Sequence, residues 1–238
     1  MVNSIAVNAQ FAKGDKMAGA SVASIIFNSG SSDVSFPQTR GYTGKITNYS
    51  LKIEPTFGWF ISGNTVVGAS LFINPNGQKA SYEDLGTTFQ KDKSTNFNIG
   101  LGAFIRNYFG AGNSFKPFGH FGFNAGISSS TTNGFKYYKG APDFKDSYNG
   151  KSSGGFFANA TLQFGLTKMV NENTGLDIYL GYNYSYSKNT LKTTTMIDNA
   201  PYDGIPESTG VSEPTTKYSS HGAIIGVGFQ VFLKGKKK

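Results

Sequence analysis

The sequence of 238 residues contains no cysteine, one tryptophan and only two histidines, His120 and His221. The absence of cysteine excludes disulfides and thiolate metal sites. Two histidines are too few for a histidine-rich metal centre. Glycine-rich phosphate loops, nucleophile elbows and metal-ligand spacings are also missing from the sequence. We therefore expect no cofactor.

Charge is scarce as well, and so are long apolar runs. Charged residues make up 15% of the chain, against about 25% in typical globular domains. No run of about 18 apolar residues exists, which excludes a transmembrane helix. The mean hydropathy is nevertheless −0.28, because serine, threonine, asparagine and 31 glycines supply the polarity in place of charge.

Alternation of apolar and small polar residues is the dominant pattern. In 54–73, EPTFGWFISGNTVVGASLFI, two alternating runs flank a turn at Gly63-Asn64, which predicts a β-hairpin. The same period of two recurs along the chain and predicts eight strands. They cover residues 16–28, 46–61, 65–74, 94–109, 115–128, 154–170, 175–187 and 218–233.

The predicted connections alternate between short and long. Short turns are expected at 62–64, 110–114 and 171–174, and long polar loops at 29–45, 75–93, 129–153 and 188–217. Long strands with short turns at one end and long loops at the other are typical of transmembrane barrels. An even number of strands places both termini at the short-turn end.

The few charges within the predicted strands avoid the middle of the apolar face. Lys52, Glu54 and Arg106 fall on the small polar face, and Lys116, Lys168 and Asp177 lie close to short turns. A charge on a lipid-facing position at mid-bilayer would cost about 2–4 kcal/mol. The apolar face therefore suits lipid, and a sheet that spans lipid must close into a barrel to pair its backbone groups.

The sequence thus predicts an all-β fold, an eight-stranded antiparallel transmembrane β-barrel with short periplasmic turns and long extracellular loops. We expect phenylalanines among the small inward residues to fill gaps. We expect aromatic girdles near the strand ends, and irregular pairing at Pro55. A soluble lipocalin-like barrel is the alternative, but its outer face would be glycine, asparagine and serine with almost no charge. The gap fillers are Phe60, Phe72 and Phe104, and the girdle residues are Tyr49, Trp59, Phe109, Tyr184 and Tyr186.

Three hairpins carry a resemblance to a known family. Residues 55–61 with 64–68 match a P-x-x-G-[YW]-F-h … N-x-x-h-G hairpin; 104–109 with 116–119, and 165–167 with 175–178, resemble the next two. The sequence resembles the small outer-membrane β-barrels of the OmpA/OmpX/OmpW type, especially the "porin family" eight-stranded barrels of Bacteroidota. The resemblance covers the strands and implies a Gram-negative outer membrane with the loops outside the cell. Such barrels usually end on an aromatic residue, whereas here Phe232 precedes a lysine-rich tail.

The sequence is expected to divide into three segments. Residues 1–15 are expected to be a periplasmic N-terminal segment, either a signal-peptide remnant or a mature N-terminus; 16–233 form the barrel; and 234–238 form a basic tail. The tail supplies half of the net charge of +8. It suits either contact with phosphates or a solubilising role.

Six inward polar residues are candidates for a lumenal polar network. They suit either a hydrogen-bonded plug or a narrow conductive path. Because the interior of an eight-stranded barrel is filled by side chains, the plug is favoured. The six are Lys52, Glu54, Arg106, His120, Gln163 and Asp177.

A second set of candidates lies in the predicted loop 133–151, which combines five aromatic residues with four lysines. Aromatic residues with lysine on an exposed loop suit contact with a glycan or a protein, while packing against one another is the equal alternative. The aromatic residues are Phe135, Tyr137, Tyr138, Phe144 and Tyr148.

One catalytic arrangement is conceivable. Ser219 and His221 lie two apart on a predicted strand, with Glu207 and Glu213 as candidate acids. A lipid A-modifying enzyme would need such a nucleophile, base and acid within hydrogen-bond reach. Nothing in the sequence ties the acids to that place, so we expect no enzyme and no catalytic residues.

The functional expectation is an integral outer-membrane protein that acts as a structural or binding protein, or as an accessory subunit of an outer-membrane assembly. The alternatives are a small channel for apolar or small polar solutes and, third, the lipid A-modifying enzyme. Expected partners are outer-membrane lipid or lipopolysaccharide and other envelope proteins, with no nucleic acid.

Overall fold

The computed structural model describes residues 11–36, 39–110, 114–138 and 143–235. This part of the chain forms nine strands and no helix, and within it no helix is long and apolar enough to cross a membrane. The strands are β1 (Lys16–Phe36), β2 (Thr39–Phe60), β3 (Thr65–Asp84), β4 (Thr87–Tyr108), β5 (Phe115–Tyr138), β6 (Phe144–Asn171), β7 (Thr174–Asn199), β8 (Ser208–Ser212) and β9 (Thr215–Leu233).

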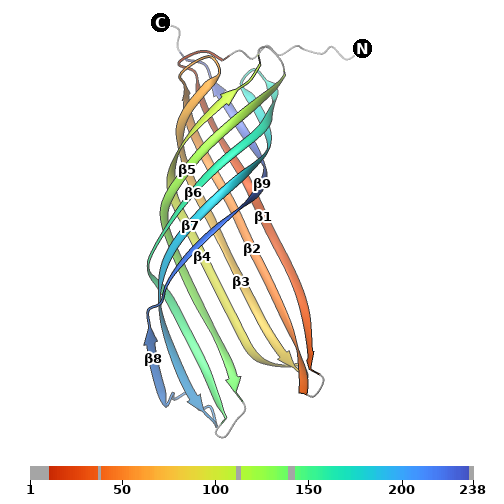
Figure 1. Ribbon diagram of the computed structural model, residues 1–238, viewed down its shortest axis with the longest axis vertical. Coiled ribbons are helices and arrows are strands. Elements are labelled where there is room, and N and C mark those ends of the chain that lie inside the picture. Colours follow the sequence, from red (N-terminus) through yellow and green to blue (C-terminus); the bar gives the residue numbers. More distant parts are fainter. Residues whose placement is uncertain (1–10, 37–38, 111–113, 139–142, 236–238) are drawn as a thin grey trace.

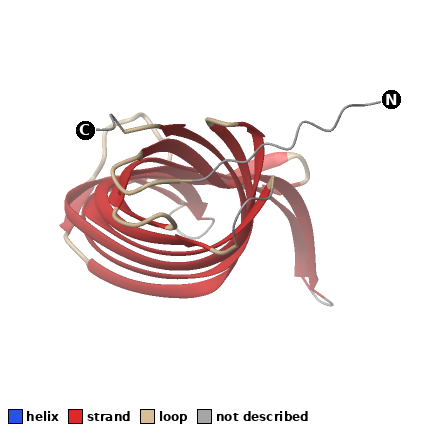
Figure 2. Ribbon diagram, turned by 90° about the horizontal axis from the view of Figure 1, so that it is seen from above, coloured by secondary structure: helices blue, strands red, loops and turns tan. Residues whose placement is uncertain are grey.

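Eight of the strands close into a ring. Each strand from β1 to β7 pairs antiparallel with the next, and β9 pairs with both β7 and β1. The short strand β8 lies outside this ring, along the far part of β7. Figure 2 shows the ring of strands seen from above. The prediction of an eight-stranded antiparallel barrel is confirmed.

The barrel has two different ends (Figure 1). At the short-turn end, Lys16 at the start of β1 pairs with Leu233 at the end of β9. The opposite, long-strand end carries the extended hairpins and β8. The start of the first ring strand and the end of the last one therefore meet at the short-turn end, as expected from the even number of strands.

The strands are much longer than their apolar parts, and most of the predicted long loops are wrong. The ring strands span 19 to 28 residues. Residues 75–93, for example, continue β3 and β4, and the turn between them is only Leu85 and Gly86, both with positive φ. A turn with two positive φ values matches the twist of a β-hairpin. Serine, threonine, asparagine and lysine extend the ladders beyond the apolar part without changing the hydrogen bonding.

The ring is not closed over its full height. β1 pairs with β9 only over Lys16–Val22, opposite Val227–Leu233. A bulge follows between Val22 and Ser24. Beyond it β1 continues along β2 alone and β9 along β7 alone, so the two strands separate towards the long-strand end (Figure 1). The barrel is thus a closed cylinder at one end and an open sheet at the other, with a seam between β1 and β9.

The alternation sorts the side chains as predicted. Leu101 and Ile225 point outwards and are more than 70% exposed, whereas the expected gap fillers Phe60, Phe72 and Phe104 are buried inside. Gly58 and Gly68 lie opposite each other beneath Phe104, where a Cβ on Gly68 would come within 2.7 Å of the ring. These glycines let the large rings fit into a narrow barrel.

Two further predictions concern Pro55 and the aromatic girdle. Pro55 lies opposite Ala20, but the β2–β3 pairing passes from Ile53 to Thr56 without it, so the expected irregularity is confirmed. Among the expected girdle residues, Trp59, Phe109 and Tyr184 are about half exposed. Tyr49 instead lies over Gly77 and reaches Thr95 with its hydroxyl at 3.5 Å.

Candidate functional site

A buried ion pair crosses the lumen near the short-turn end. Nη1 of Arg106 donates to Oδ2 of Asp177 at 2.7 Å, and both side chains are almost fully buried. The same carboxylate accepts hydrogen bonds from Thr167 at 2.6 Å and Gln230 at 3.0 Å. Four strands, β4, β6, β7 and β9, therefore meet at Asp177. Such multiple satisfaction is what a buried charge requires.

The guanidinium of Arg106 is held from other sides as well. Its Nε lies 3.4 Å from Nδ1 of His120, and its Nη1 donates to the Tyr108 hydroxyl at 3.3 Å. The group also lies 4.1 Å above the Phe118 ring, within cation–π range. His120 stacks on Phe104 with ring centroids 5.2 Å apart.

An aromatic layer closes the lumen below this network. Phe11 packs against Phe60 and Phe232 with ring centroids 4.5 and 4.6 Å apart, and against Tyr108 at 5.2 Å. Lys116 lies 4.9 Å from the Phe11 ring. Phe11 belongs to the segment 1–15 that the sequence places before the barrel, and its buried ring caps the base of the lumen.

Glu54 and Lys52, two of the other predicted lumenal residues, lie further from the short-turn end than Arg106. Glu54 accepts from Asn124 at 3.1 Å, and Asn124 accepts from Ser70 at 2.7 Å. Lys52 lies 5.2 Å from the Phe72 ring. Gln163 is buried opposite His120 in the β5–β6 register.

Of the six predicted residues, the structure brings Arg106, His120 and Asp177 into one contact network and places Glu54 in a second. Sequence reasoning missed the remaining polar members, because it selected mainly charged and ionisable residues among the inward positions. The signal was available, since each is a polar residue at an inward position of the alternating pattern. These members are Ser70, Tyr108, Asn124, Thr167 and Gln230.

Above the networks the lumen is lined by amides and hydroxyls. Asn74 and Asn98 are linked at 3.4 Å, Asn76 and Asn96 at 3.1 Å, and Ser130 donates to Asn96 at 2.6 Å. No charged side chain takes part in this chain of contacts. It extends the polar lining towards the long-strand end.

The five aromatic residues predicted for an exposed loop do not form one cluster. They lie on the extended strands β5 and β6 and divide between the two faces of the sheet. Tyr138 stacks on Phe144 at 4.6 Å, and Tyr148 donates to Asp92, all at inward positions. Phe135 and Tyr137 occupy outward positions, 5.4 Å apart. The prediction of a loop is wrong here, because these residues continue the strand ladder.

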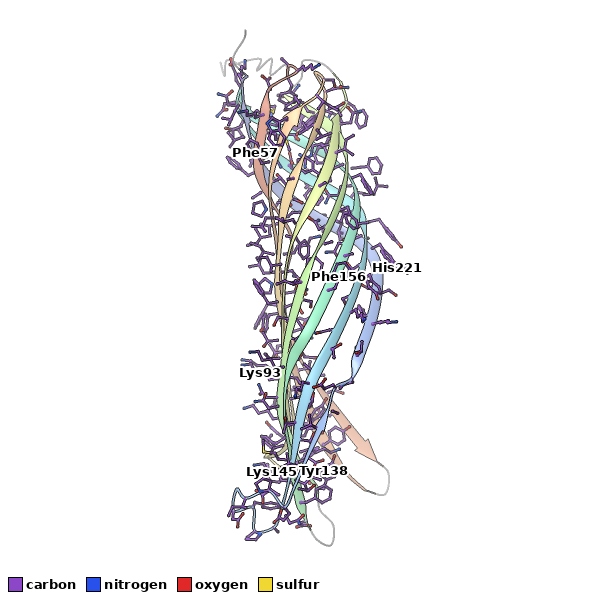
Figure 3. The ribbon with its side chains drawn as sticks, turned by 90° about the vertical axis from the view of Figure 1, so that its left-hand side faces the viewer. Phe57, Lys93, Tyr138, Lys145, Phe156 and His221 are labelled. Atoms are coloured by element: carbon purple, nitrogen blue, oxygen red, sulfur yellow. The ribbon has the colours of Figure 1, made fainter. Side chains whose placement is uncertain are left out.

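The outward pair is surrounded by positive charge. Nζ of Lys145 lies 5.6 Å from the Phe135 ring and 5.5 Å from the Tyr137 ring. A hollow of about 510 Å³ beside Phe135 is lined by Lys79, Lys91, Lys93, Asn133, Gly134, Asp92 and Tyr148. In Figure 3, Phe57 and Lys93 lie along the same outer side of the wall.

Ser219 and His221 do not form a catalytic arrangement. Nδ1 of His221 pairs with the Tyr182 hydroxyl at 2.6 Å on the outward face. Glu207 accepts from the Asn199 backbone at 2.7 Å, and Glu213 pairs with Lys192 at 3.3 Å. Both candidate acids are therefore committed elsewhere. Within the described ranges, no group of three His, Asp or Glu residues is placed to hold a metal.

No family model matches the sequence, and no curated protein matches it either. Among solved structures, the outer membrane protein OprG from Pseudomonas aeruginosa is similar, with 16% identity, a TM-score of 0.39, and coverage of 94% of this chain and 99% of that one. The outer membrane protease OmpT from Escherichia coli has 10% identity and a TM-score of 0.35, over 92% and 97% of the two chains. The CymD monoaromatic hydrocarbon channel has 8% identity and a TM-score of 0.17, over 96% and 90%. Likenesses this weak transfer neither an activity nor a ligand, so the function has to rest on this chain's own residues.

Proposed function

We propose that the chain is an integral outer-membrane β-barrel with a sealed lumen, which acts as a structural or binding protein. The observation that carries the proposal is the inverted distribution of its side chains. The apolar residues point outwards, while a buried, ion-paired polar network lies inside.

The outward belt is far larger than the apolar patches of a soluble monomer, which cover a few hundred Å². It follows all the ring strands whose side chains are described, and no charged residue interrupts it. Lipid is the solvent that suits such a surface. Spanning barrels of this kind occur in outer membranes. The outward large residues that are at least 45% exposed include Trp59, Leu101, Ile105, Phe121, Phe123, Ile127, Phe156, Leu162, Phe164, Ile178, Leu180, Ile225, Val227 and Phe229.

The sealed lumen favours a non-conducting protein over a channel. The contacts of Arg106 and Asp177 join opposite walls, and the ring of Phe11 covers the base below them. An ion would have to displace both layers. The test is single-channel recording of the purified full chain in a planar bilayer, with a known porin as the positive control.

The expected result is no conductance above the lipid background from protein that has inserted. Insertion is checked by the shift in gel mobility of the folded barrel on heating. Unitary current steps in the wild type, with an ion selectivity that changes in Asp177→Asn, would contradict the proposal. They would mean that ions pass through the buried network.

The binding part of the proposal rests on the long-strand end. Strand β8 is exposed throughout and pairs on one side only, with β7. An exposed strand edge is a template for pairing with another chain. Extraction in mild detergent, followed by native sizing and mass spectrometry, is expected to show other envelope proteins migrating with the barrel. A lone barrel in its micelle would remove the role of accessory subunit.

A small-solute channel is the second candidate, and the seam between β1 and β9 is the observation that favours it. The seam joins the amide-lined upper lumen to the outer surface without passing the sealed base. Swelling of protein-containing liposomes in solutions of small polar and apolar solutes tests this route. Rates equal to those of protein-free liposomes would exclude it.

A further inference from the structure

The outward face changes from apolar to lysine at a corresponding point on most of the ring strands. On β3 the outward positions run from Val67 to Ile73 and then reach Lys79; on β4 they run from Ile105 to Phe97 and then reach Lys93. In each of six strands the first charged outward residue beyond the apolar belt is an exposed lysine. These are Lys45, Lys79, Lys93, Lys151, Lys188 and Lys217, which we call the lysine girdle.

The spacing places the girdle at the level of lipid headgroups. Val67 and Lys79 are separated by about 40 Å of strand at ~3.3 Å per residue. With a strand tilt of about 40°, this is about 30 Å along the barrel axis. The hydrocarbon core of a bilayer is about 30 Å thick. The lysines therefore lie where the hydrocarbon ends, on the side of the long-strand end.

Pairs of lysines lie directly opposite each other in the girdle. Lys79 pairs in register with Lys93, and Lys188 with Lys217. Like charges directly opposite each other on one face of a sheet are destabilising. Within the described part of the chain, the ion pairs of the girdle level are Lys45–Glu83 and Lys192–Glu213. None involves Lys79, Lys93, Lys188 or Lys217, so these four lysines are available to an anion from outside the chain.

Three exposed lysines gather at the hollow beside Phe135. Lys79, Lys91 and Lys93 line it, and all three are exposed. Its one carboxylate, that of Asp92, occupies an inward position, where Oδ1 accepts from Tyr148 and Oδ2 accepts from Gln90 at 2.8 Å, and within the described ranges it forms no ion pair with the three lysines. The three lysines are thus free for an anion.

We propose that this hollow binds the phosphorylated headgroup of a glycolipid in the membrane leaflet at the long-strand end. Lysine binds phosphate as a compact point charge. Phe135 and Tyr137 lie on the side of the lysines away from the belt, and they offer an apolar surface that suits the sugar. The position in the headgroup plane favours a lipid phosphate over free phosphate. This inference rests on the proposed membrane placement of the barrel.

The test measures lipid binding to the purified full chain by native mass spectrometry. The probes are bisphosphorylated lipid A, the same lipid A after enzymatic dephosphorylation, and inorganic phosphate. The variant K79Q/K91Q/K93Q is compared with K13Q/K16Q/K234Q, which removes the same three charges at the short-turn end. Lys13, Lys16 and Lys234 are also exposed, so the two variants match in net charge and accessibility.

Phosphorylated lipid A is expected to bind the wild-type chain and the control variant equally. Each lysine lost from the hollow is expected to weaken binding about fivefold, and the triple variant on the order of 100-fold. Equal retention of lipid A by the triple variant would overturn the proposal. Equal binding of dephosphorylated lipid A would do the same, as would binding of inorganic phosphate without any preference for the lipid.

Folding and insertion are followed separately in every variant, by gel mobility before and after heating and by Trp59 fluorescence. A triple variant that inserts normally but no longer retains lipid A supports the site. A wild-type chain that does not insert would refute the proposed membrane placement itself. The two failures are therefore distinguishable.

Discussion

Replacing Asp177 with asparagine tests the buried network most directly. The substitution keeps the shape of the side chain but removes its charge, and it turns one of the two acceptor atoms into a donor. Oδ2 now accepts from Arg106 at 2.7 Å and from Gln230 at 3.0 Å, and Oδ1 accepts from Thr167 at 2.6 Å. In either orientation of the new amide, its N–H groups point at a side chain that donates a hydrogen bond to Asp177 in the wild type. Arg106 stays charged and buried without its counterion.

The expected loss in the free energy of unfolding is about 3–5 kcal/mol, the usual result of removing one partner of a buried ion pair. The assay is reversible guanidinium unfolding of the barrel in lipid vesicles, followed by the emission of Trp59. Trp59 is the only tryptophan and lies half-exposed on the outward face. Its emission therefore reports the transfer from lipid to water.

The matched control is Glu172→Gln. Glu172 also faces a lysine, Lys234, but at 3.9 Å and with both side chains exposed. Exposed pairs of this kind contribute about 0–1 kcal/mol. In the double variant Arg106→Met/Asp177→Leu, the loss is expected to be smaller than the sum of the two single losses, because no unpaired charge remains. A loss below about 1 kcal/mol for Asp177→Asn would refute the buried, coupled pair.

Further predictions test the packing, the belt and the long-strand end. Gly102→Ala would place a Cβ in steric conflict with Oδ1 of Asn124, so we expect a loss of about 1–3 kcal/mol in vesicle unfolding, while Gly222→Ala, with open space around it, should unfold like the wild type. Leu101→Lys on the belt should cost about 2–4 kcal/mol, whereas Asn133→Lys at the girdle level should cost at most about 1 kcal/mol; equal losses would contradict the membrane level. Burial, together with the hydrogen bond to Asp92 and its negative charge, raises the pKa of Tyr148 above its ordinary value. The stability that neutral Tyr148 contributes is thus present below about pH 10 and lost as the pH rises further. Unfolding midpoints measured on both sides of about pH 10 should fall more in the wild type than in Tyr148→Phe, and identical pH profiles would show that Tyr148 has no raised pKa.

Much of the barrel was predictable because alternation is a local property. The predicted strands starting at Thr65 and Phe115 and the one ending at Leu233 coincide with observed strand limits at the short-turn end. There the apolar belt stops at a turn, so the change of pattern and the change of structure fall at the same residue. At the other end the belt stops while the strand continues, and the polar continuation was interpreted as loop. Residues 133–151 are the clearest case, since strand ladders carry all five aromatic residues.

The buried network around Asp177 was also predictable only in part. The inward position of Arg106 and Asp177 follows from counting in twos along each strand. Their direct contact does not, because 71 residues and two intervening strands separate them in the chain. The uncharged partners Thr167 and Gln230 are also far from Arg106 in the sequence, at separations of 61 and 124 residues.

The sequence alone therefore determined the number of strands in the ring and the two faces of each strand. These properties depend on the side-chain period of two, which every strand obeys independently of its neighbours. Only the tertiary structure decided how far β1 and β9 pair, which charges meet across the lumen, and that Lys79 lies beside Lys93 on the outer surface. Those contacts depend on how the ring closes and on the register between strands, and no single strand carries that information.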